Sequence, residues 1–92
     1  MLKKKKIRIT SRKAYEVLKL AALVNGKDYG ECRKDTKQIL VSMIAGNREA
    51  YKTLIHEILH AIEFEYDIKI SHALIRKLEE PIYRVLKLNG WI

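Results

Sequence analysis

The chain has 92 residues, a formal net charge of +8 and 48% hydrophobic residues. A chain of this length forms one domain, which we place over residues 1–92, and its apolar content excludes a disordered protein. The longest uncharged stretch covers residues 38–47, far fewer than the 18 or so that a membrane span requires, so we expect no transmembrane helix.

The single cysteine, Cys32, cannot form an internal disulfide. The lysine-rich residues 1–6 are not followed by the apolar run of a secretory signal, so we expect a cytoplasmic protein. Cys32 could ligate a metal, but a small residue in a strand is the simpler interpretation.

Basic residues concentrate near the start of the chain, at Lys3 to Lys6, Arg8, Arg12 and Lys13. Such a cluster could attract nucleic acid or an anionic surface, or it could be a solvated basic tail. Many Lys, Glu and Ile beside few Gln and Asn is also the balance of heat-adapted (thermophile) proteins. Nucleic-acid binding is therefore the weaker interpretation of the charge.

The first half of the chain predicts a strand, a helix and two further strands. Residues 7–10 alternate in polarity, as a short strand does. Ser11 can cap a first helix that ends at Asn25-Gly26. Its apolar positions follow the helical repeat: Ala14, Val17, Leu18, Ala21 and Ala22. Residues 30–33 and 38–44 then predict two strands joined by a polar turn.

The second half predicts two more helices. One begins at Gly46-Asn47 and runs to about Tyr66, where Asp67 can take the left-handed conformation that turns the chain back. Ser71 caps the next helix, in which Pro81 should introduce a kink or a break. The predicted fold class is therefore α+β, with three main helices and a small antiparallel or mixed β-sheet.

The second predicted helix contains His56-Glu57-Ile58-Leu59-His60, the H-E-x-x-H signature of zinc proteases. Residues four apart on a helix lie one above the other, so both imidazoles can bind one tetrahedral metal. Glu57 lies about 100° round the helix from His56. It is thus placed to hydrogen-bond a metal-bound water and to act as the general base.

The histidines do not belong to the predicted core. One apolar stripe of this helix follows the spacing i, i+3, i+4, i+7, i+11 and consists of Tyr51, Leu54, Ile55, Ile58 and Ile62. His56 and His60 lie roughly 130° to 170° from its centre. The histidines are therefore not part of the core packing. A chance cluster on a surface helix is the alternative interpretation, and the rarity of this pattern in a chain with only three histidines argues against it.

A catalytic zinc keeps three protein ligands and one position for water, so one more ligand must approach from elsewhere. Metzincins would require Gly at 63 and His at 66, whereas this chain has Glu63 and Tyr66. Glu63 suits an outer partner of His60 better than a ligand. His72 is the preferred third ligand because it is the one remaining histidine, with Glu79 and then Glu80 as alternatives.

Several segments together resemble the minigluzincins, a family of small soluble zinc metallopeptidases from thermophiles. They are Tyr29-Gly-Glu, Lys37-Gln-Ile-Leu, Thr53-Leu-Ile-His-Glu-Ile-Leu-His-Ala and Ser71-His72-Ala-Leu-Ile, and the likeness covers about residues 29–90. The resemblance implies a zincin-like minimal catalytic domain with zinc on His56, His60 and His72 and with Glu57 catalytic. It also implies kinship with the catalytic domains of membrane-embedded zinc proteases.

The resemblance further implies a zymogen, with a C-terminal segment that covers the cleft within one chain or is exchanged between two. We therefore expect residues 82–92 to be a latency segment and the chain to form a homodimer through its C-terminal helix. An ordinary core helix is the alternative for this segment.

The sequence thus predicts a zinc-dependent endopeptidase (a hydrolase and metalloprotease) that acts on peptides or unfolded proteins. The strand 38–44 could hold an extended substrate by strand addition. Arg76 or Tyr83 could stabilise the oxyanion. The alternatives are a non-catalytic zinc-stabilised binding module and a basic nucleic-acid-binding domain.

Overall fold

The computed structural model describes residues 4–92 and contains a four-stranded mixed sheet and two helices. The elements are β1 (Lys4–Arg8), β2 (Ala14–Leu20), β3 (Gly30–Arg33), β4 (Gln38–Ser42), α1 (Asn47–Tyr66) and α2 (His72–Leu88). The sheet order is β1-β2-β4-β3. β2 and β4 run parallel, whereas β1 and β3 pair antiparallel with their neighbours. The chain is therefore α+β, as predicted.

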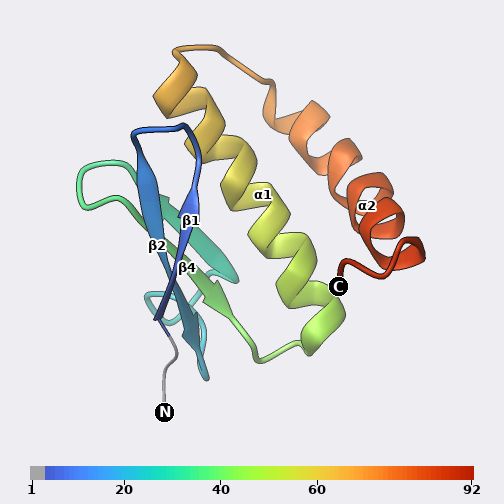
Figure 1. The fold of residues 1–92 in the computed structure, drawn as a ribbon. Coiled ribbons are helices and arrows are strands. Elements are labelled where there is room, and N and C mark those ends of the chain that lie inside the picture. The colour runs from blue at the N-terminus through green and yellow to red at the C-terminus, as the bar shows by residue number, and fades with distance from the viewer. Residues whose placement is uncertain (1–3) are drawn as a thin grey trace.

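The helices form two further layers on one face of the sheet. α1 lies between the sheet and α2 (Figure 1). α1 contacts β3, β4 and α2, whereas α2 contacts no other element than α1 among residues 4–92. The position of α2 therefore depends on its contacts with α1.

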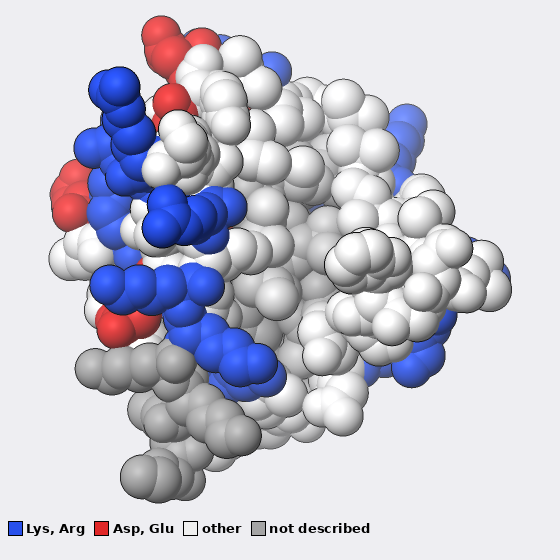
Figure 2. All heavy atoms as spheres, in the orientation of Figure 1, with Lys and Arg blue, Asp and Glu red and all other residues white. Residues whose placement is uncertain are grey.

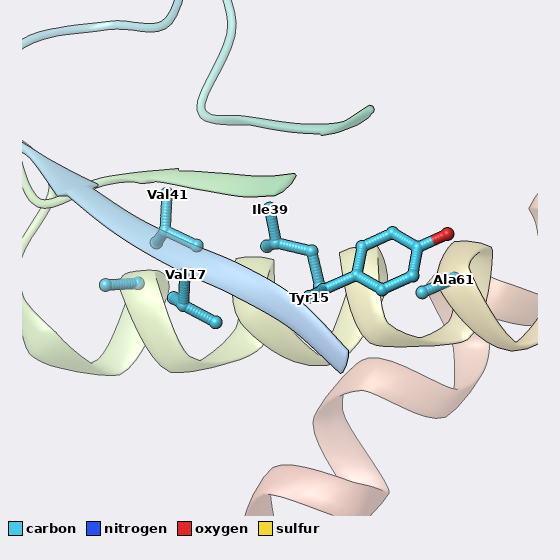
Figure 3. Packing of buried hydrophobic residues seen from close by; sticks show 6 residues of the cluster. Tyr15, Val17, Ile39, Val41 and Ala61 are labelled. Atoms are coloured by element: carbon cyan, nitrogen blue, oxygen red, sulfur yellow. The ribbon is translucent and has the colours of Figure 1, made fainter. Parts of the chain in front are cut away.

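The core lies between the two central strands and α1. Tyr15 and Val17 of β2 and Ile39 and Val41 of β4 point toward α1, where Ala61 leaves room for the tyrosine ring (Figure 3). The Tyr15 hydroxyl donates a hydrogen bond of 2.7 Å to Glu65, which also accepts one from Lys37. Burial, and then the Glu65 carboxylate, raise the pKa of Tyr15 far above its usual range. This network joins the sheet to the C-terminal part of α1.

The predicted helix after Ser11 is wrong: the segment forms β2, so the structure has two helices rather than three. A tight loop precedes the strand, in which the Thr10 hydroxyl accepts hydrogen bonds from the backbone of Arg12 and Lys13. Tyr15 and Val17 alternate inward as strand residues do. Two partners, β1 and β4, hold the segment in the sheet, and this tertiary pairing outweighs its helix-compatible alanines.

Pro81 was expected to kink or break the helix, and it does not break it: α2 continues through Pro81. Proline removes the hydrogen bond to the carbonyl four residues earlier, that of Lys77. Both Pro81 and Lys77 are exposed, so water can satisfy that carbonyl. The predicted ends are confirmed: Asp67 is left-handed with φ 51°, and Ser71 caps α2 through the Leu74 amide.

Within residues 4–92, neither helix combines the length and the apolar character that crossing a bilayer would require.

Candidate metal centre

α1 positions the residues of the H-E-x-x-H segment. The helix follows Gly46, whose φ of 93° favours glycine and whose carbonyl accepts the first helical hydrogen bond, 3.0 Å from the Ala50 amide. It then runs without interruption to Tyr66. His56 and His60 consequently lie one turn apart on the same side.

The turn after α1 brings His72 back to this side. Asp67 ends α1, and the Ile68 amide donates to the Glu63 carbonyl at 3.2 Å. Ser71 then begins α2 by accepting a hydrogen bond of 3.1 Å from the Leu74 amide. His72 is the first residue of α2, and its imidazole reaches the two imidazoles of α1.

Three imidazoles lie close together, with His56 between the other two. The Nε2 atom of His56 lies 3.1 Å from the Nε2 atom of His60 and 3.1 Å from that of His72. Zinc–nitrogen bonds of 2.0–2.1 Å in a tetrahedral site would separate two ligand atoms by about 3.3–3.4 Å. The two spacings to His56 are close to this value, and all three ligand atoms lie within 4.8 Å of one another, so zinc binding requires His60 and His72 to move closer together. Within residues 4–92, these three side chains are the group that could hold a metal.

Two glutamates orient the motif histidines from behind. Glu79 of α2 lies 2.6 Å from Nδ1 of His56, and Glu63 lies 2.9 Å from Nδ1 of His60. A carboxylate at Nδ1 holds the proton there and leaves the Nε2 lone pair free for a metal. Glu63 also accepts the Ile70 amide at 2.9 Å. That amide, and then the bond from His60, lower the pKa of Glu63.

The alternative ligands and the oxyanion candidates occupy different places. Glu79 is engaged at Nδ1 of His56, away from the three Nε2 atoms, and Glu80 forms ion pairs with Arg48 and Lys52 of α1. Arg76 lines the cavity beside the histidines. Tyr83 does not, and its ring lies 5.5 Å from the Arg48 guanidinium.

Glu57 points away from solvent beside the same cavity. Its side chain is 6% exposed, and it is one of two buried polar residues of the described chain. Burial, and then the negative charges of Glu31, Glu79 and Asp28, raise the pKa of Glu57 to about 7. A carboxyl group with such a pKa can take up and release a proton near neutral pH.

Gly30 brings the edge strand β3 close to Glu57. A Cβ atom at Gly30 would lie 2.4 Å from the Thr53 methyl group and 3.0 Å from Oε2 of Glu57. A side chain would therefore force β3 and α1 apart. This contact is difficult to predict from the sequence, since a lone glycine in a strand indicates a close backbone approach without identifying its partner. The sequence places Glu79 on the same side of its helix as His72, but it does not predict that Glu79 contacts Nδ1 of His56.

Comparisons with protein-family models, with curated proteins and with solved structures each find no match to this chain. The interpretation of the site therefore depends on the geometry of its own residues.

We predict that His72→Ala weakens zinc binding far more than Glu79→Gln does. His72→Ala removes a metal ligand, whereas Glu79→Gln removes only the carboxylate that orients His56, which typically costs about 10- to 100-fold in affinity. Competition with a chromogenic chelator measures both affinities. If His72→Ala binds zinc like the parent and Glu79→Gln does not, then Glu79 is the ligand.

We predict that Glu57→Gln stabilises the metal-free protein at neutral pH. The folded state holds this proton more tightly than the unfolded chain, so ionisation penalises folding as the pH rises from about 4.5 to about 7. Replacement should raise the free energy of unfolding by roughly 2–3 kcal/mol at about pH 8 and by little at about pH 5.

Urea unfolding in the presence of a chelator measures both values. Glu49→Gln changes an exposed glutamate of the same helix and serves as the control, with no gain expected at either pH. An equal effect of Glu57→Gln at both pH values would mean that Glu57 is not held in a destabilising environment.

Proposed function

We propose that the chain is a zincin-like minimal catalytic domain, a zinc-dependent endopeptidase that hydrolyses peptide bonds in peptides or unfolded proteins. The observation that supports this function is the cluster of three imidazoles beside a buried glutamate in an open cavity. Three neutral ligands leave a fourth position of a tetrahedral ion free, as catalytic zinc sites do.

Zinc bound at His56, His60 and His72 would supply a Lewis acid that polarises the substrate carbonyl and acidifies a water molecule. Glu57 lines the same cavity and accepts the proton of the attacking water on a carboxylate oxygen. It then donates that proton to the leaving amine nitrogen. The raised pKa of Glu57 suits both halves of this transfer.

The substrate would bind along β3. The strand 38–44 was expected to hold the substrate, but β4 is paired on both sides, with β2 and β3, so it offers no free edge. β3 lies at the edge of the sheet, and its first residue, Gly30, lines the cavity together with Tyr29. The free backbone groups of β3 can pair with an extended peptide and carry its carbonyl past the histidines.

Arg76 is the better-placed candidate for stabilising the oxyanion. Its side chain lines the cavity from α2, and a guanidinium group there would oppose the negative charge that develops on the carbonyl oxygen. Tyr83 is engaged with Arg48 instead.

The latency segment stays a prediction. Glu79 is the last residue in the chain that lines the cavity, so residues 82–92 do not form part of its wall. The residues that line the cavity therefore do not support the hypothesis that the C-terminal segment covers the cleft.

We predict that the zinc-loaded chain cleaves an unfolded protein such as reduced casein. Glu57→Gln should lower kcat by about 10²- to 10⁴-fold and keep its zinc, because Glu57 moves a proton and does not bind the metal. Initial rates and metal content are measured on the same samples. A parent chain that binds zinc without cleaving any peptide would instead indicate a non-catalytic binding module. Zinc lost in parallel with activity in Glu57→Gln would make this glutamate structural.

A further inference from the structure

The outer side of α2 carries an apolar stripe that is largely exposed, with Leu78 half-buried. The stripe follows the spacing i, i+4, i+7, i+11, i+14 and consists of Leu74, Leu78, Pro81, Val85 and Leu88. Leu74, Val85 and Leu88 are 47%, 59% and 81% exposed. Ile75 is the one fully buried side chain of this helix. We call this surface the outer stripe.

Positive charge borders the outer stripe. Of the exposed basic residues of α2, Lys77 and Arg84 lie nearest the stripe, with Arg84 also paired to Glu80, whereas Arg76 lines the cavity on the other side of the helix. The two acidic residues of the helix, Glu79 and Glu80, are turned toward α1, where they contact His56 and Arg48. In Figure 2 the surface over α2 is largely white, has blue at its margins and shows no red. The stripe therefore meets solvent as an apolar surface with cationic edges.

Trp91 lies just beyond the end of α2. The Gly90 amide donates to the Lys87 carbonyl at 3.2 Å, and the Trp91 amide donates to the Leu86 carbonyl at 2.9 Å. These two bonds form a Schellman end, which holds the backbone of Trp91 against the last turn. The indole nevertheless remains 77% exposed. Tryptophan at the end of an amphipathic helix favours the boundary between water and lipid headgroups.

We propose that the outer stripe and Trp91 bind the surface of an anionic lipid bilayer, with α2 lying in the plane of the interface. An exposed apolar stripe with Lys and Arg at its edges is the pattern of helices that insert one face among lipid headgroups. The formal net charge of +8 draws the whole molecule toward such a surface. A bilayer accepts such a stripe among its headgroups without a complementary groove.

A second copy of the chain fits this surface less well. Two stripes packed together would bring Lys77 and Arg84 of each copy near the same residues of the other, and these like charges repel. Pro81, in the middle of the stripe, also interrupts close helix pairing. An anionic bilayer neutralises the same charges.

The stripe and the candidate metal centre lie on different sides of α2. At 100° per residue, Val85 lies about 120° round the helix from Glu79, and Leu74 lies about 160° from His72. A bilayer that contacts the stripe would thus leave the cavity beside His72 open. This inference does not depend on the proposed peptidase activity, and its test measures binding alone.

The test is co-sedimentation of the full, zinc-saturated chain with two kinds of vesicle. One contains equal amounts of phosphatidylcholine and phosphatidylglycerol, and the other contains phosphatidylcholine alone. We expect binding to the mixed vesicles that is at least ~10-fold tighter than to the neutral ones. The single tryptophan of the chain, Trp91, should shift its fluorescence to shorter wavelength with the mixed vesicles.

Three double variants locate the contact. Val85→Ser with Leu88→Ser removes the exposed apolar groups, and Lys77→Gln with Arg84→Gln removes two positive charges of α2. Each pair should weaken binding to the mixed vesicles by at least ~10-fold. Lys5→Gln with Lys6→Gln removes the same charge from exposed positions of β1 and should cost less than ~3-fold. Circular dichroism and zinc content, which should match the parent, show that each variant is folded.

Four results would overturn the proposal. They are no binding to mixed vesicles, equal binding to both kinds, a β1 variant as weak as the α2 variants, and unchanged Trp91 emission in the bound protein. Sedimentation equilibrium without lipid tests whether a second copy of the chain binds the stripe. A dimer that dissociates in the Val85→Ser, Leu88→Ser variant would assign the stripe to a second copy instead.

Discussion

The site depends on a constraint that α1 cannot satisfy alone: three imidazole nitrogens must meet within about 3 Å, and only two of them can come from one helix. His72 has to be supplied by α2, and α2 contacts α1 alone among the elements of the described chain. Ile75 is the one fully buried side chain of α2 and is worth about 2–3 kcal/mol, and half-buried residues such as Ile82 and Leu86 add to it. The partly exposed ion pairs of Glu80 add little more.

The site itself adds further contacts between the helices. Glu79 of α2 meets His56 of α1, and Glu63 of α1 holds the Ile70 amide just before α2 begins. The groups that orient the histidines therefore also fix the second helix. A metal bound by both helices would strengthen the attachment of α2, so the geometry of the site and the docking of this helix stabilise each other.

Glu57 illustrates a conflict between stability and chemistry. The approach of β3, which Gly30 permits, and the packing of α1 remove the Glu57 carboxyl group from water. That burial penalises the ionised form and destabilises the fold above the ordinary pKa of a glutamate. The same environment gives a proton acceptor that works near neutral pH, which an exposed glutamate on α1 would not provide.

How far the sequence predicts the structure depends on whether the signal is local. His56 and His60 could be selected from their i, i+4 spacing, which is a short-range feature of one helix, whereas His72 was chosen because it is the one remaining histidine. The Ser71 cap and the left-handed Asp67 are likewise local features, and both were predicted. β2 was mistaken for a helix because its identity as a strand depends on pairing with β1 and with β4, more than twenty residues later. The contacts of Gly30 with Thr53 and of Glu79 with His56 appear only once β3 and α2 are packed on α1.

The central claim, a three-histidine centre with one open position, is tested most directly by X-ray absorption at the zinc edge of the zinc-loaded chain. The account predicts three imidazole nitrogens at about 2.0–2.1 Å and one oxygen from water, with no sulfur in the first coordination shell. A shell that contains the Cys32 sulfur, a Glu79 carboxylate in place of His72, or four protein ligands would contradict it.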